Sequence, residues 1–154
     1  MKSMTPSAAA GTSRIRGIIS RGIISSNGRR KVILKWMHRG PDSFDIATIL
    51  FLLHEIPYEK QVLVLNEALR VARRAIVVDS RVPLPKNLHG IALRIVEALG
   101  GPGHYRSFAD YLAANGISGV LADSRVRASV AGHSVFWHGC REMVVLERQV
   151  KTSV

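Results

Sequence analysis

A histidine and a carboxylate stand at the ends of two apolar runs, where they could bind a small ligand or take a proton. His54 follows the run 46–53, and Asp79 ends the run 75–79. In open α/β sheets, ligands bind outside the carboxyl ends of the strands, so both side chains would face one rim. An imidazole that titrates near neutral pH could orient or deprotonate a hydroxyl group. Alternatively, His54 bonds only the backbone of its loop, and Asp79 caps the loop that leads to Pro83.

A second candidate pair, His104 and Tyr105, follows a glycine-rich stretch at residues 100–103. Surface loops often carry function and can move, so a loop here could act as a lid over a site. The alternative is that both residues enter a helix and pack against the core. The candidate substrate-binding residues are therefore His54, Asp79, His104 and Tyr105.

No metal site is predicted from the C-terminal histidines and cysteine. His133, His138 and Cys140 are spaced by five and two positions, which fits no zinc pattern. Cys140 is the only cysteine of the chain, so no internal disulfide can form. A reducing compartment fits this cysteine usage.

The elements that must position the candidate residues are typical of an α/β domain. The run 46–53 is almost continuously apolar, as in a strand covered on both faces of a parallel sheet. Pro57 suits the first turn of a helix, and residues 62–72 carry one apolar stripe at helical spacing. The run 75–79 then predicts a second buried strand. Strand, helix and strand with a short return predict a right-handed crossover unit.

Two more helices and a hairpin are predicted further along the chain. Residues 88–99 form one amphipathic helix. Phe108, Tyr111 and Leu112 form the apolar stripe of another, which Asn115-Gly116 ends. Residues 126–136 and 143–146 read as two β segments. We expect them to form a C-terminal antiparallel hairpin.

The positive charge of the chain is concentrated at its N-terminal end. The 154 residues include 22 Lys and Arg against 11 Asp and Glu, a formal net charge of +11 with a pI near 10.9. Residues 1–41 hold nine of the basic side chains and no acidic one, which leaves residues 42–154 nearly neutral. We therefore expect a basic, poorly ordered segment at 1–41 and an α/β domain at 42–150.

The basic segment has several interpretations. Arg29-Arg30-Lys31 with Lys35 and Trp36 could contact phosphates and a base, but a run of charge is usually just solvated, so nucleic-acid binding is not expected. An Arg-rich, Ser-rich and acid-poor start also matches an organelle transit peptide, the alternative to a cytoplasmic location. No run of 18 apolar residues occurs, so no membrane-spanning helix is predicted.

Five short segments stand in an order that is familiar from one family. They are Phe44-Asp45-Ile46-Ala47, Leu53-His54-Glu55-Ile56-Pro57, Asn66-Glu67-Ala68-Leu69-Arg70-Val71, Val77-Val78-Asp79 and Gly103-His104-Tyr105-Arg106-Ser107-Phe108. Together they resemble the C-terminal half of class I S-adenosylmethionine-dependent methyltransferases, nearest to the ubiquinone- and menaquinone-biosynthesis (type 11) group. The likeness covers roughly residues 42–148.

The resemblance implies a fold, a reaction and a set of contacts. The fold would be a partial Rossmann-like domain of parallel strands with crossover helices and a C-terminal antiparallel hairpin. The reaction would be methyl transfer from S-adenosylmethionine to a small-molecule acceptor, with Leu52, Leu53 and His54 against the cofactor. Since such enzymes work mostly by holding the methyl donor and the nucleophile in line, no catalytic residue is predicted.

The sequence departs from this family upstream of Phe44. Such enzymes place a glycine-rich turn against the cofactor, and an acidic residue after the second strand takes the ribose hydroxyls. No Gly-x-Gly-x-Gly precedes Phe44, and no acidic residue precedes Asp42. The chain would then be truncated, degenerate or completed by a partner, and truncation is favoured. The alternative function is a non-catalytic methyltransferase-like fragment or interaction module that binds no cofactor; the oligomeric state is not predicted.

Overall fold

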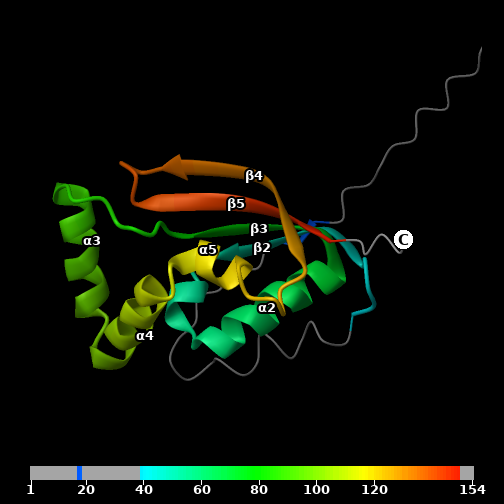
Figure 1. The fold of residues 1–154 in the computed structure, drawn as a ribbon, viewed down its shortest axis with the longest axis horizontal. Coiled ribbons are helices and arrows are strands. Elements are labelled where there is room, and N and C mark those ends of the chain that lie inside the picture. Colours follow the sequence, from blue (N-terminus) through cyan, green and yellow to red (C-terminus); the bar gives the residue numbers. More distant parts are fainter. Residues whose placement is uncertain (1–16, 19–38, 150–154) are drawn as a thin grey trace, which may run out of the picture.

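The computed structural model describes residues 17–18 and 39–149. Within them, five strands form one sheet in the order β1-β2-β3-β5-β4 (Figure 1). The first three strands pair in parallel and the last two pair antiparallel: β1 (Gly17–Ile18), β2 (Phe44–Leu50), β3 (Ala72–Ser80), β5 (Arg141–Arg148) and β4 (Ala128–Phe136). The predicted α/β class, with parallel strands, a crossover helix and a C-terminal antiparallel hairpin, is confirmed.

The proposed N-terminal segment, residues 1–41, lies almost entirely outside the described residues. The interpretations placed on Arg29, Arg30, Lys31, Lys35 and Trp36, and on a transit peptide, therefore also lie outside them. Within the part of the chain that the structure covers, no helix is long and apolar enough to cross a membrane.

The described helices gather on one side and at one end of the sheet. The described helices are α2 (Tyr58–Val71), α3 (Leu88–Leu99), α4 (Pro102–Ala113) and α5 (Gly116–Leu121), and a 3-10 turn, η1 (Leu53–Glu55), precedes α2. Figure 1 shows α2, α4 and α5 below the strands, while α3 stands at the end of the sheet. The main core lies between this helical layer and the strands. Leu65, Val77, Tyr111 and Leu146 are fully buried in it.

Strand β2 ends earlier than the apolar run 46–53 predicts. Phe51 has a left-handed backbone (φ 51°), which turns the chain out of the strand direction. Its N–H still donates to the Val78 carbonyl, and Leu53 then begins the η1 turn. The expectation of a strand through Leu53 was therefore wrong by three residues.

The return from helix to strand is tighter than expected. β3 starts at Ala72, directly after the last residue of α2. Ala72, which ends the apolar stripe predicted to be helical, belongs to the strand, and so do Arg73 and Arg74. The short return places the carboxyl ends of β2 and β3 side by side, with Leu50 opposite Val78.

The helix predicted over residues 88–99 has the predicted bounds. Asn87 caps it by accepting the Gly90 N–H at 2.9 Å. A Cβ atom at Gly90 would lie 1.9 Å from the Pro85 carbonyl oxygen, so only glycine allows α3 to pack this closely against the preceding chain.

The next helical segment differs from the prediction at both ends. α4 already begins at Pro102, so His104 and Tyr105 lie in its first turn and not in a loop. At the other end, the predicted stop is present, since Asn115 adopts a left-handed backbone (φ 64°). The short helix α5, which follows at once, was not predicted.

Candidate functional site

His54 and Asp79 form a buried pair at the carboxyl ends of β2 and β3. Nδ1 of His54 lies 2.5 Å from Oδ1 of Asp79, and the two side chains are 5% and 0% exposed. Oδ2 of Asp79 accepts the Leu53 N–H at 2.9 Å and the His54 N–H at 3.4 Å, and Oδ1 accepts the Ser80 N–H at 2.7 Å. The two residues predicted to face one rim are therefore in direct contact.

The η1 turn that carries His54 is held from two sides. From β3, the Asp79 carboxylate binds the first N–H groups of the turn. From α2, the buried Gln61 amide donates to the carbonyl oxygens of Leu53 at 2.9 Å and Ile56 at 3.0 Å. These side-chain contacts satisfy backbone groups that have no ladder partner after β2 has ended.

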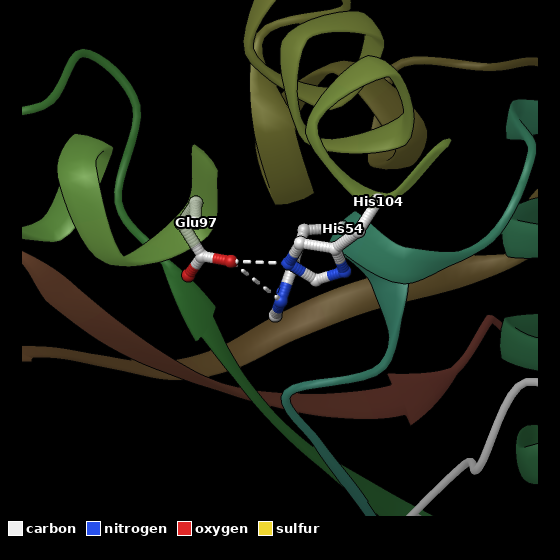
Figure 2. Close-up of side chains that lie close together, drawn as sticks. All are labelled: His54, Glu97 and His104. Atoms are coloured by element: carbon white, nitrogen blue, oxygen red, sulfur yellow. Dashed lines mark hydrogen bonds and ion pairs between the residues drawn. The ribbon is translucent and has the colours of Figure 1, made fainter. Parts of the chain in front are cut away.

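Glu97 and His104 complete a cluster around the free edge of the His54 ring (Figure 2). Oε2 of Glu97 lies 2.6 Å from Nε2 of His104 and 3.7 Å from Nε2 of His54. The two imidazole rings meet edge to face, with their centroids 5.7 Å apart. Glu97 comes from α3, His104 from α4 and His54 from η1, so three separate elements converge on one point.

A glycine allows His104 to take this position. The His104 ring packs against the end of α3, where a Cβ atom on Gly100 would lie 2.6 Å from its Cδ2 atom. Any other residue at Gly100 would displace the ring or the helix end. The lack of a side chain at Gly100 thus leaves room for the His104 ring beside Glu97.

Arg141 adds a positive charge beside the cluster. It donates to the Ser80 hydroxyl at 2.6 Å, and its Nη2 lies 3.8 Å from Oε1 of Glu97. Its guanidinium also packs over the rings of Phe51 at 4.8 Å and Trp137 at 5.6 Å from their centroids. Together with Phe136, these three residues line an open hollow of about 320 Å³.

The cluster shifts the protonation of the groups that it encloses. Burial of His54 favours the neutral ring, but the hydrogen bond and charge of Asp79, with the charges of Glu97 and Glu55, outweigh burial and raise the pKa of His54 above 6.5. Burial, followed by the charge of Asp79, strongly raises the pKa of Tyr111, so its hydroxyl keeps its proton.

The remaining predicted contacts are placed differently. The Leu53 side chain is fully buried in the core, and the Leu52 side chain is partly buried and packs against it. Tyr105 is 44% exposed on the first turn of α4. Of the candidates, the structure therefore brings together His54, Asp79 and His104.

Glu97 was missed by sequence reasoning. It lies four residues after Leu93 and seven after Gly90, on the buried face of α3. A carboxylate on the apolar side of an amphipathic helix is rarely buried without a partner, and that position was the available signal.

His133, His138 and Cys140 have three different surroundings. His133 pairs with Glu142 at 2.9 Å, the His138 ring stacks on His89 with centroids 3.7 Å apart, and Cys140 is buried in a small apolar cluster. No contact among the described residues joins the three.

Comparison with known proteins gives a distant structural likeness. No family model and no curated protein matches the chain. Among solved structures, it is similar to TnmH (TM-score 0.46, 20% identity, 71% of this chain and 32% of that one). It is also similar to the mitomycin 7-O-methyltransferase MmcR (TM-score 0.46, 17% identity, 70% of this chain and 30% of that one). The chain thus spans about a third of the length of these structures.

Proposed function

We propose that this chain forms the acceptor side of an S-adenosylmethionine-dependent methyltransferase, in which His54 accepts the proton of a small-molecule hydroxyl group. The observation that carries the proposal is the buried His54–Asp79 pair at the carboxyl ends of two neighbouring parallel strands. This is the edge at which open α/β sheets bind their ligands. The order of the sequence segments that resemble class I methyltransferases supports the type of reaction.

The pair is arranged as a base with its orienting group. Asp79 accepts the Nδ1 proton of His54, which leaves the Nε2 lone pair free and fixes the plane of the ring. Oε2 of Glu97 lies 3.7 Å from Nε2, which is longer than a hydrogen bond. An acceptor hydroxyl that approaches this edge can hand its proton to Nε2, and the resulting oxyanion is the stronger nucleophile toward a methyl group.

The described residues do not fit S-adenosylmethionine by themselves. The Leu53 side chain is buried in the core, and its N–H is taken by Asp79, so neither faces a cofactor. The sequence before Asp42 offers neither a glycine-rich turn nor an acidic residue for the ribose. The donor would therefore need a surface outside the described residues.

This misfit favours the second candidate function, a methyltransferase-like module that binds an acceptor or a partner without catalysis. Both candidates keep the same acceptor site, and they differ in whether methyl transfer follows. A small-molecule acceptor is part of the first proposal, and nucleic acid is part of neither.

The proton-transfer step is testable with 4-nitrophenol, because its phenolate absorbs at a longer wavelength than the phenol. In buffer with a metal chelator, the full chain should raise the phenolate fraction at fixed pH, and His54→Gln should abolish this effect. His138→Gln is the matched control. An equal signal from His54→Gln would overturn the proposal. Methyl transfer from labelled S-adenosylmethionine to a panel of phenols then separates the two candidates, since a bound but unmethylated acceptor supports the non-catalytic one.

A further inference from the structure

We propose that His54, Glu97 and His104 form a binding site for a divalent transition-metal ion, with zinc as the best fit. The inference goes beyond the proposed function and does not depend on methyl transfer. It uses the edge of the cluster that faces away from Asp79, where three potential ligand atoms point toward one another (Figure 2).

The distances are close to those of a bound ion. Each of the three residues offers one ligand atom, and all of these atoms lie within 4.8 Å of one another. Zinc binds histidine nitrogen and carboxylate oxygen at about 2.0–2.2 Å, so neighbouring ligand atoms in a tetrahedral site are roughly 3.4 Å apart. The His54–Glu97 distance of 3.7 Å already matches this spacing. The His104–Glu97 contact of 2.6 Å holds a shared proton, and it would widen by less than an ångström when an ion replaces that proton.

The donor types select the class of metal. Two imidazole nitrogens and one carboxylate oxygen suit zinc and the neighbouring transition metals, whereas calcium and magnesium prefer an all-oxygen shell. Three protein ligands leave the fourth tetrahedral position for water or another small ligand.

A supporting group already orients the first ligand. Histidines that bind metals almost always donate their second ring N–H to a carboxylate or carbonyl, which fixes the tautomer and aims the other nitrogen at the metal. Asp79 does this for His54, and three backbone N–H groups hold the Asp79 carboxylate in turn. Nε2 of His54 is thereby aimed at Glu97 before any ion arrives.

Charge and access also favour a cation. Asp79 and Glu97 are two carboxylates with 0% and 7% exposed side chains, and a divalent ion neutralises them without a proton on either imidazole. Arg141, 3.8 Å from the far oxygen of Glu97, leaves the oxygen that faces the histidines unobstructed. His104 is 24% exposed, so an ion can enter along its ring.

Metal binding and proton transfer would exclude each other at one atom. The Nε2 lone pair of His54 cannot take a proton while it binds an ion. If the proposed function holds, a bound metal switches off His54 as a base. The two proposals can fail separately, because the phenol test is made in chelator and the metal test needs no acceptor.

The experiment uses the full chain, produced without a histidine tag and stripped with chelator. Cobalt(II) serves as the visible probe, and zinc affinity is measured by competition with a chromophoric chelator. We expect one ion per chain with the intense visible bands of a tetrahedral cobalt site, and a thermal midpoint that rises with zinc. Glu97→Gln and His104→Gln should each weaken binding by at least about tenfold, and Asp79→Asn by about 10- to 100-fold.

His89→Gln and His138→Gln are the matched controls, because these two rings stack on each other and neither offers a ligand atom to the cluster. They should bind as the unaltered chain does. The proposal is overturned if the chain binds no ion at millimolar cobalt, or if Glu97→Gln and His104→Gln bind normally. It is also overturned if the controls lose the ion. His104→Gln changes a partly exposed side chain, so it keeps the test decisive even where Glu97→Gln fails to fold.

Discussion

The Tyr111 hydroxyl donates to the carbonyl oxygen of Ser80 at 2.9 Å, and Ser80 is the residue that follows Asp79. Both residues are fully buried, and the contact ties α4 to the end of β3. The helix that carries His104 and the strand that carries Asp79 are therefore fixed to each other by one hydrogen bond as well as by apolar packing.

Removing this bond should loosen the two elements. Tyr111→Phe keeps the ring and loses the hydroxyl, so we expect the free energy of unfolding to fall by about 1–2 kcal/mol. Urea denaturation measures the change. Tyr105→Phe removes an exposed hydroxyl from the same helix and should leave stability unaltered. Equal stability of Tyr111→Phe and the unaltered chain would contradict the structural role of the bond.

Breaking the buried pair should cost far more than breaking a surface pair. Asp79→Asn removes the charge that His54 and three N–H groups surround, and we expect a loss of about 3 kcal/mol. Glu147→Gln breaks a pair with Arg74 whose side chains are 40% and 61% exposed, and the loss should stay below about 1 kcal/mol. Chemical denaturation of both variants tests the ranking, and similar losses would show that burial does not strengthen the first pair.

The close approach of the Pro85 backbone to Gly90 should make this position intolerant of any side chain. Gly90→Ala would force a Cβ atom to within 1.9 Å of the Pro85 oxygen, and relief of that clash should cost about 1–3 kcal/mol. Gly103 lies in α4 with nothing within 4 Å of its added Cβ, so Gly103→Ala should be neutral or stabilise by up to about 1 kcal/mol. Thermal melts of the two variants give the comparison. A stable Gly90→Ala chain would mean that α3 can shift without cost.

The ion pair between Asp123 and Arg125 should make the stability of the fold depend on pH in the acid range. Hydrogen bonds from the Arg125 side chain and backbone, with a smaller one from Tyr58, hold the pKa of Asp123 well below 3.8. A carboxylate with a lowered pKa stabilises the fold at pH values above its unfolded pKa, and this contribution disappears as the pH falls toward the folded one. Asp123→Asn should therefore be less stable than the unaltered chain at neutral pH.

The difference between these two chains should shrink as the pH falls below about 4, because the Asp123 carboxyl then gains a proton in the unfolded chain while the folded chain still excludes it. Urea midpoints taken at several pH values measure it. A difference that stays constant across the acid range would contradict a charge-based effect. Lys60→Gln changes an exposed charge in the first turn of α2 and serves as the control.

Local signals made the helix over residues 88–99 predictable. A capping Asn87, a regular apolar stripe and the following Gly100 all point to the same bounds. The end of β2 lacked such a signal, because Phe51 adopts a left-handed backbone that favours glycine or asparagine. Tertiary contacts hold it there, and a sequence pattern does not display them.

The site was predictable only in part, for a similar reason. Because parallel strands end at the same edge of a sheet, the sequence predicted that His54 and Asp79 face one rim. The sequence did not predict that Glu97 lies beside them, because 43 positions separate Glu97 from His54. The position of α3 against the sheet is set by packing, which a sequence pattern does not display. His104 was expected in a loop, because Pro102, the first residue of α4, belongs to the glycine-rich stretch at residues 100–103.

The cluster of Figure 2 is divided between two parts of the chain. His54 and Asp79 belong to the crossover of β2, α2 and β3, whereas Glu97 and His104 belong to the α3–α4 hairpin. The Tyr111–Ser80 hydrogen bond joins these two parts, whereas the His54–Asp79 contact lies within the first part alone. The site is thus complete only where the helical hairpin packs on the crossover, so the packing between the two parts sets its geometry.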